Sequence, residues 1–298
     1  MEYIYEALRK TEQIPAAYEE WKQYREQVTS YLLSKVKHQS RIAILGAGQS
    51  NDLELRRLVE AGHELVLLDR DNSAMKQGLQ RQFGEDAARV SIECRHCDIW
   101  PVTVEDYHQL EELLLQNTDM EVIVGWMKTL TKRLEQSTPD LGTGYDWLVV
   151  MGLHSQVNIM FVTLLHYYIG TFGLDYSKRD VQMYYAMVTQ MNQEMTMHIQ
   201  PFLMQAARRQ LFAYEYGSFE PGEEQIYDVL NLFRQGRADC VQKLGISRVE
   251  GALQWEQLLS KEYAQQCLQI RDWNYLVWPF CKDKQYLMVF YECCKAGL

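Results

Sequence analysis

Short apolar runs recur along the chain, and each of them ends at a turn or at a polar residue. The clearest are 41–45, 64–68 and 145–151, which are rich in Ile, Leu and Val. Runs of this length and composition, bounded by Gly and Asp, are typical of strands that are buried on both faces of a parallel sheet. Weaker runs at 89–94 and 210–216 bring the series to five predicted strands.

Between these runs, apolar residues recur every three or four positions, which is the spacing of an amphipathic helix. The spacing predicts an amino-terminal helical segment over residues 1–40, followed by one enlarged domain over 41–298. Within that domain it predicts helices at 107–115, 122–134, 159–169, 223–234 and 249–263.

The chain closes with two aromatic-rich runs, 269–280 and 285–292, joined by the polar residues 281–284. Such a pair predicts a terminal β-hairpin. With the five earlier strands and the intervening helices, it indicates the α/β class. We expect a Rossmann-like, seven-stranded and mostly parallel sheet that carries an antiparallel terminal hairpin.

The turn after the first strand reads Gly46-Ala-Gly48-Gln-Ser-Asn-Asp52, and Asp69 follows the second strand 21 residues after Gly48. Glycines let a ligand approach the backbone closely, and an acid at this edge of the sheet can accept hydrogen bonds from both hydroxyls of a ribose. A dinucleotide site would place a third glycine where Asn51 stands. The acids Asp52 and Glu54 would also oppose a pyrophosphate at the start of the next helix.

S-adenosylmethionine has no phosphate and carries a sulfonium and an ammonium, so acids near the loop suit it. Here the chain resembles the class I S-adenosylmethionine-dependent methyltransferases whose first motif reads like G-x-G-x-x-N-D-L-x-L. The resemblance covers most of 41–98, resumes at 145–156 and returns in the terminal hairpin. It departs from the family's frequent pattern at Ile44, where an acid is common, and at Ser50, where a third glycine is common.

The resemblance implies a role for each matching residue. The loop Gly46, Ala47 and Gly48 would line the methionine part of the cofactor, Asp69 would hold the ribose, and Asp98 would face the adenine amino group. Because of the two departures, Asn51 or Asp52 would take over contacts at the methionine end. The remaining cofactor contacts implied are Arg70, Ile99 and Met151.

The formal net charge of -10 and a pI near 5.3 argue against a nonspecific nucleic-acid binder. The strand at 145–151 is followed by Met-Gly-Leu-His rather than by an Asn-Pro-Pro-Tyr element, which disfavours methylation of a base amino group. We therefore expect a small-molecule acceptor, with aromatic compounds and natural products as the candidates.

No signal-like leader and no apolar run of about 18 residues is present, so we expect a cytoplasmic protein without a membrane partner. The seven cysteines predict reduced thiols. Cys94 and Cys97 form a C-x-x-C pair, but no second ligand pair follows at metal-site spacing, so we interpret the pair as part of a strand and expect no metal.

His154 follows the strand at 145–151 and is the best candidate for a general base or a substrate contact, because residues there face the transferred methyl group in the resembled family. The alternative is a histidine that caps or packs against the next helix. A second candidate is the Tyr- and Met-rich segment 172–205, a predicted helical insertion. It predicts either a lid, with Tyr184 and Tyr185 contacting substrate, or a helix whose Met and Tyr side chains pack inward.

Two other functions remain open at this stage. One is an NAD-dependent oxidoreductase, which Asn51, Asp52 and the terminal hairpin oppose. The other is a non-catalytic protein that keeps the fold and the cofactor and serves as a scaffold, because methyl transfer needs few obligatory side chains. The oligomeric state, the acceptor and its methylated atom do not follow from the sequence.

Overall fold

The computed structural model describes residues 3–11, 14, 16–237, 241, 244–265 and 267–295. Its strands form one sheet, in the order β3-β2-β1-β4-β5-β8-β7, with β6 paired to β5 beside this path. The strands are β1 (Arg41–Leu45), β2 (Glu64–Asp69), β3 (Ile92–His96), β4 (Tyr145–Met151), β5 (Ala207–Phe219), β6 (Ser247–Arg248), β7 (Leu268–Cys281) and β8 (Lys284–Lys295).

The strands β1 to β5 run parallel, and β8 lies antiparallel between β5 and β7. The predicted Rossmann-like sheet with its terminal hairpin is therefore confirmed. Order and direction are those of the class I methyltransferase fold that the sequence resembles. The short strand β6 is an addition that the sequence analysis did not predict.

Several predicted strands have different bounds in the structure, and two of them show the physical reason. The third strand was expected at 89–94 but is Ile92–His96, because a 3₁₀ helix (Gly84–Ala88) and its turn, in which Arg89 N donates to Asp86 O, extend over its predicted start. The fifth strand was expected at 210–216 but covers Ala207–Phe219, because β8 pairs with nearly its whole length.

Alternate strand residues pack on opposite faces of the sheet, as the period of two requires. Ile42 and Ile44 belong to one buried cluster, whereas Ala43 and Leu45 belong to the other. The first face is covered by α3 (Lys22–Lys35), α4 (Leu55–Glu60) and α5 (Asn72–Phe83), with the short α2 (Ala17–Glu20) beside β7. The other face carries α13 (Glu250–Ala264).

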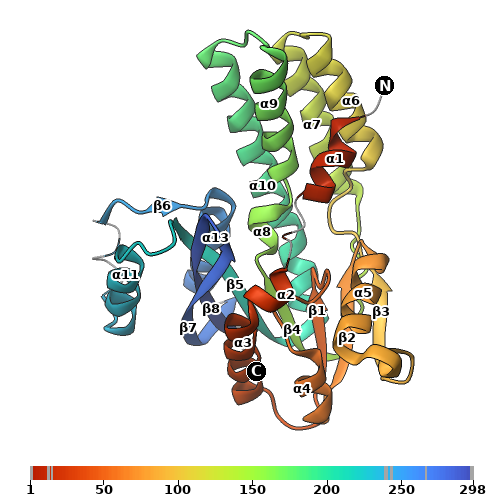
Figure 1. The fold of residues 1–298 in the computed structure, drawn as a ribbon, viewed down its shortest axis with the longest axis vertical. Helices are drawn as coiled ribbons and strands as arrows, with labels where there is room; N and C mark the ends of the chain where they lie inside the picture. Colours follow the sequence, from red (N-terminus) through yellow and green to blue (C-terminus); the bar gives the residue numbers. More distant parts are fainter. Residues whose placement is uncertain are drawn as a thin grey trace.

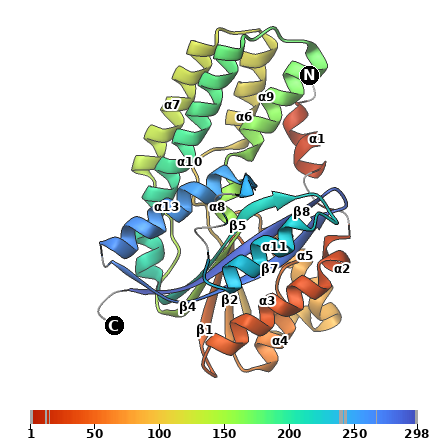
Figure 2. The same ribbon diagram turned by 90° about the vertical axis from the view of Figure 1, so that its left-hand side faces the viewer.

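A bundle of long helices stands above the carboxyl edge of the sheet (Figures 1 and 2). We call it the helical cap; it consists of α6 (Val104–Leu115), α7 (Met120–Gln136), α9 (Ile159–Phe172) and α10 (Lys178–Ala206). Helix α1 (Ile4–Thr11) packs against α6 and α9. The remaining helices are α8 (Leu153–Gln156), directly after β4, and α11 (Gln225–Arg234), beside β7.

The helical cap is larger than the insertion predicted at 172–205. It is built from two crossovers, because α6 and α7 connect β3 to β4, and α9 and α10 connect β4 to β5. The predicted amino-terminal helical segment is divided between two places: α1 joins the helical cap, whereas α2 and α3 pack beside the sheet.

Candidate functional site

A cavity of about 230 Å³ lies between the carboxyl ends of β1, β2 and β3 and the helices above them. Its floor comes from the three residues that end these strands or follow them: Gly46, Asp69 and Asp98. The parallel order of the three strands brings these residues to one edge of the sheet. The lid side is formed by residues of α1, α6, α8 and α9.

Gly46 allows the backbone to turn tightly at the floor of the cavity. It has φ of 72°, in the left-handed region that glycine adopts without strain, and its N–H donates to Leu68 O at 2.8 Å. A Cβ at this position would lie 3.2 Å from Leu153 Cδ1. Glycine thus lets α8 approach the loop.

Gly78 of α5 lets that helix pack closely against the backbone of the glycine loop. A Cβ on Gly78 would lie 2.4 Å from the backbone oxygen of Gln49, so only glycine fits there. The sequence offered no signal for this contact, because Gly78 lies inside a helical pattern far from the loop.

Asp69 holds the glycine loop while facing the cavity. Its Oδ2 accepts from Gly48 N at 2.8 Å and its Oδ1 accepts from Asp71 N at 2.8 Å. Burial raises the pKa of this carboxyl, and the two backbone N–H groups act in the opposite direction. Each oxygen keeps further acceptor capacity, because a carboxylate can accept about four hydrogen bonds.

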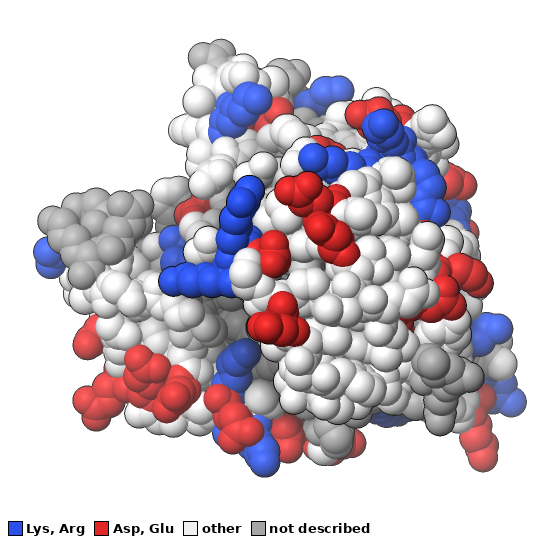
Figure 3. Space-filling view, turned by 90° about the horizontal axis from the view of Figure 1, so that it is seen from above, with Lys and Arg blue, Asp and Glu red and all other residues white. Residues whose placement is uncertain are grey.

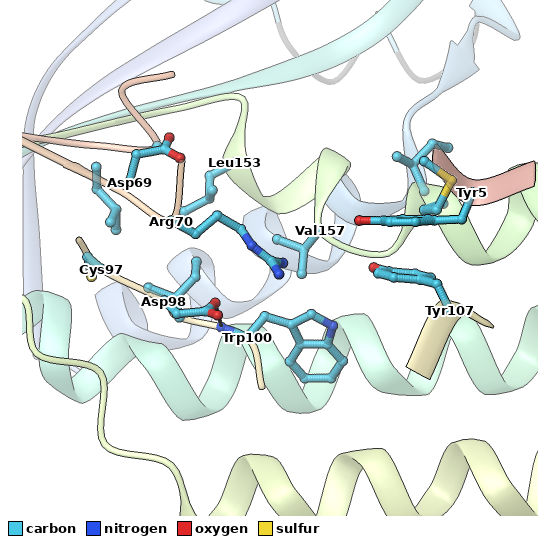
Figure 4. Close-up of a pocket in the computed structure, with 14 residues that line it drawn as sticks. Tyr5, Asp69, Arg70, Cys97, Asp98, Trp100, Tyr107, Leu153 and Val157 are labelled. Carbon is cyan, nitrogen blue, oxygen red and sulfur yellow. Dashed lines mark hydrogen bonds between the residues drawn. The ribbon is translucent and has the colours of Figure 1, made fainter. Parts of the chain in front are cut away.

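Asp98 and Arg70 place opposite charges in the same cavity (Figure 4). The exposed carboxylate of Asp98 accepts from Trp100 N at 3.2 Å, and the Arg70 guanidinium donates to Val102 O at 3.2 Å. Figure 4 shows that the guanidinium extends between Val157 and Trp100. Ile99 also lines the cavity, so four of the implied cofactor contacts beyond the loop meet here: Asp69, Arg70, Asp98 and Ile99.

The far end of the cavity is aromatic. The rings of Tyr5 and Tyr107 stack with centroids 4.4 Å apart and planes 8° apart, and both residues line the cavity with Trp100. The sequence analysis missed these three residues. Trp100 could have been found from its place two residues after Asp98, whereas Tyr5 and Tyr107 lie in helices whose packing the sequence does not specify.

A buried carboxylate holds α1 over this end. Glu111 is fully buried and accepts from Ile4 N at 2.7 Å, from Tyr5 N at 2.8 Å and from the Tyr168 hydroxyl at 2.6 Å. The carboxylate therefore satisfies free N–H groups at the start of α1, where negative charge is favourable.

Five of the residues assigned to the cofactor from the resemblance do not line the cavity. Ala47 and Met151 pack into the core on the other face of the sheet. Asn51 Oδ1 accepts from Arg81, and the backbone oxygen of Asn51 accepts from Arg25 at 3.2 Å. Asp52 is half-buried, and burial raises its pKa to about 6. Gly48, likewise absent from the lining, acts through its hydrogen bond to Asp69.

The geometry does not support His154 as a general base at this cavity. Its side chain is 3% exposed, does not line the cavity, and stacks on Trp255 with ring centroids 4.3 Å apart. Burial lowers the pKa of the imidazole to about 3, so it would be a weak proton acceptor. The ring lies on the side of α8 that faces α13.

Tyr184 and Tyr185 also lie away from the cavity lining. The Tyr184 hydroxyl donates to Phe161 O at 2.9 Å inside the helical cap, and Tyr185 pairs with His166 between α9 and α10. The methionines 187, 191 and 195 are at most 2% exposed. The Tyr- and Met-rich segment therefore follows the second expectation, inward packing, and the cavity is covered instead by α1, α6, α8 and α9.

The C-x-x-C pair lies at the end of β3 with both thiols free. Cys97 lines the cavity, and burial raises the pKa of its thiol to about 12. Within the described ranges, no group of three or more His, Cys, Asp or Glu is arranged to hold a metal ion. No helix in the described part of the chain has the length and apolar character needed to span a membrane.

No protein-family model and no curated protein matches the chain. Among solved structures, a magnesium protoporphyrin IX methyltransferase from Synechocystis, with bound SAH, is 11% identical at a TM-score of 0.41, over 90% of this chain and 82% of the other. A SAM-dependent methyltransferase from Methanosarcina mazei is 10% identical at a TM-score of 0.44, over 89% of this chain and 97% of the other.

A protein described as a zinc-dependent alcohol dehydrogenase from Rhodobacter sphaeroides also matches, with 10% identity and a TM-score of 0.39, over 94% of this chain and 98% of the other. Similarity at this level carries no information about what the chain binds. The fold assignment therefore depends on the strand order, and the functional assignment depends on the site.

Proposed function

We propose that this protein binds S-adenosylmethionine in the cavity above β1, β2 and β3 and transfers its methyl group to a small-molecule acceptor. The observation that carries the proposal is the meeting of Gly46, Asp69 and Asp98 in one cavity, at the ends of three adjacent parallel strands. An acid at the second strand and another at the third suit a ligand with a ribose and an adenine amino group.

The residues present fit this cofactor. The Asp69 carboxylate is already oriented by two backbone N–H groups and can accept from the ribose hydroxyls with its free lone pairs. Asp98 is exposed to the cavity and can accept from an exocyclic amine. Gly46 is exposed and lines the cavity, so a ligand can approach its backbone.

When bound, the cofactor supplies a methyl carbon that its sulfonium makes electrophilic. The protein's contribution is then to orient the acceptor about 3 to 3.5 Å from that carbon and to keep water out. Leu153, Val157 and Met160 provide an apolar wall for this purpose. A base is required only where the acceptor atom must lose a proton, and we assign none.

The charge distribution favours a small acceptor over a nucleic acid. On the face seen in Figure 3, Lys and Arg are interspersed with Asp and Glu and do not form a continuous basic surface. With a net charge of -10, the protein would have little electrostatic attraction for a phosphate backbone.

Calorimetry tests cofactor binding. S-adenosylmethionine and its demethylated product should bind, and Asp69→Ala should weaken binding by about 1 to 3 kcal/mol through the loss of a charged acceptor. Asp146→Ala is the matched control, since Asp146 accepts from Arg41 N at the opposite edge of the sheet. Tight binding of NAD without binding of S-adenosylmethionine would overturn the proposal.

Transfer is tested separately with cofactor that carries a labelled methyl group. The protein is incubated with small-molecule, RNA and protein fractions of a cell extract, and label should enter the small-molecule fraction. Label in RNA would overturn the acceptor class. Binding without label in any fraction would favour the non-catalytic scaffold.

A further inference from the structure

The two ends of the cavity differ in chemistry. The floor carries two carboxylates and a glycine, whereas the far end is built from the rings of Tyr5, Tyr107 and Trp100. Of the described residues that line the cavity, Arg70 alone carries a positive charge. The place of that charge decides what the far end can bind.

Arg70 connects the two ends. Its backbone directly follows β2, beside the floor, but its side chain extends away from the strand and passes between Val157 and Trp100. Figure 4 shows the hydroxyl ends of Tyr5 and Tyr107 directed toward the guanidinium. The positive charge therefore faces the aromatic end of the cavity.

The guanidinium has hydrogen-bonding capacity left for a ligand. It donates to Val102 O at 3.2 Å, and a guanidinium has several further N–H donors. No acidic side chain in the described part of the chain lies within 4.0 Å of it, although Asp69 and Asp98 line the same cavity. The Arg70 side chain is also exposed. Its planar fork matches the two oxygens of a carboxylate.

The walls around this charge suit a flat, apolar body. Tyr5 and Tyr107 form a stacked pair, and the apolar side chains of Val157 and Met160 line the cavity with them. Aromatic rings pack on one another in offset-stacked or edge-on contacts, which add to the gain from burying apolar surface. The far end thus combines one positive charge with a surface that fits a ring.

We propose that the far end of the cavity is the acceptor subsite, and that it takes an aromatic carboxylate whose anionic group pairs with Arg70. This inference rests on the proposed function, because it assigns the methyl acceptor to the same cavity as the cofactor. Arg70 anchors the carboxylate, and the stacked pair of Tyr5 and Tyr107 packs against the ring of the acceptor. An amine would be repelled by the same guanidinium, so the subsite selects by charge.

Four probes separate charge from shape: benzoate, benzamide, benzylamine and acetate. Each is titrated into the full chain with and without saturating S-adenosylhomocysteine, and binding is followed by ligand-observed NMR. Benzoate should bind about tenfold tighter than benzamide, because a hydrogen bond between two charged groups is stronger than one to a neutral group. Benzylamine should not bind, and acetate should bind more weakly than benzoate because it lacks the ring.

Variants of Arg70 test whether this side chain binds the carboxylate. Arg70→Gln should weaken benzoate binding about tenfold or more and should leave benzamide binding within about threefold. Arg70→Lys keeps the charge without the planar fork, so its loss should be smaller. Melting temperatures show that each variant is folded.

The matched control is Arg56→Gln. Arg56 is likewise exposed, and its guanidinium also donates to a backbone oxygen, Gln82 O, at 3.0 and 3.2 Å, but it does not line the cavity. This substitution should leave the affinity for all four probes unchanged.

Several results would overturn the assignment: equal binding of benzoate and benzamide, equal loss of benzoate affinity in Arg56→Gln, or competition between benzoate and S-adenosylhomocysteine. A loss of S-adenosylhomocysteine affinity in Arg70→Gln as large as the loss for benzoate would also overturn it, because Arg70 would then serve the cofactor.

The outcomes for the subsite and for the proposed function can be told apart. If benzoate binds through Arg70 and neither S-adenosylmethionine nor its demethylated product binds, the carboxylate subsite stands and the methyltransferase assignment fails. If the cofactor binds and benzoate affinity does not depend on Arg70, only the subsite fails.

Discussion

The loop beside the cavity and the side of α8 that faces α13 both bury polar side chains, but they differ in whether those side chains find hydrogen-bond partners. Near the loop, Gln82 of α5 accepts from Leu55 N at 2.8 Å and donates to Ser50 O at 3.0 Å and to Leu53 O at 2.9 Å. Around α8, by contrast, His154 Nε2, Asn158 Oδ1 and Trp255 Nε1 are buried and have no hydrogen-bond partner among the described residues.

The difference separates two uses of buried polarity. Gln82 substitutes for the partners that the irregular loop backbone lacks, so its hydrogen-bonding capacity is used up in holding that shape. The orphaned atoms around α8 hold no backbone in place. Groups of the first kind stabilise the fold, and groups of the second kind reduce its stability.

Gln82→Leu should give the largest effect, because it leaves one backbone N–H and two carbonyls without partners. Each orphaned buried group costs about 1 to 3 kcal/mol, so the free energy of unfolding should fall by about 3 kcal/mol or more. Urea denaturation measures this change.

The control is Gln80→Leu, an exposed position on the same helix, which should stay within about 0.5 kcal/mol. If Gln82→Leu were as mild as the control, the comparison between the two regions would lose its basis.

His154 should make the protein sensitive to acid. The pKa of its imidazole is about 3 in the folded protein, against 6.5 for a free histidine side chain, so below pH 6.5 the unfolded chain binds a proton that the folded chain does not. Stability contributed by the neutral ring is thus lost as the pH falls from 6.5 toward 3, by roughly 2 kcal/mol at pH 5.

His154→Phe keeps a ring to stack on Trp255 and removes the titration. Urea denaturation at several pH values should show a smaller loss of stability between pH 6.5 and 5 than in the parent protein. An unchanged pH dependence would mean that the imidazole is hydrated and accessible, contrary to its burial.

The sheet and the cofactor edge could be predicted because their signals are local. Runs such as 42–45 are apolar at every position, whichever side of the sheet it faces, and Gly46, Asp69 and Asp98 lie at a strand end or within two residues after it. Parallel pairing then brings the three together without further information.

The cover of the cavity could not be predicted, because it depends on contacts between distant residues. Helical spacing identified α6 and α7 as helices but not as part of the helical cap. Tyr5 lies at the cavity because its N–H donates to Glu111, 106 residues away in the chain, and its ring stacks on Tyr107. The same limitation applies to His154: its place after β4 was read correctly, but the side of α8 on which the ring lies depends on α13.

Of the three predicted effects on stability, that of Glu111→Gln should be the smallest, and it should be confined to α1. The amide nitrogen of Gln cannot accept, so either Ile4 N or Tyr5 N loses its partner. These N–H groups at the start of α1 can still bond to water if α1 moves away from the rest of the protein, which limits the cost. The free energy of unfolding should fall by only about 1 kcal/mol. The effect should appear in α1, as faster amide hydrogen exchange over residues 4–11. Release of S-adenosylhomocysteine in stopped-flow measurements should also be faster, because Tyr5 covers the cavity.

The control is Glu112→Gln, at the exposed neighbouring position. The Glu112 carboxylate accepts from the Tyr3 hydroxyl at 2.7 Å, and its replacement should alter neither rate appreciably. Unchanged exchange and release in Glu111→Gln would show that α1 is held by its aromatic contacts with Tyr107 rather than by the buried carboxylate.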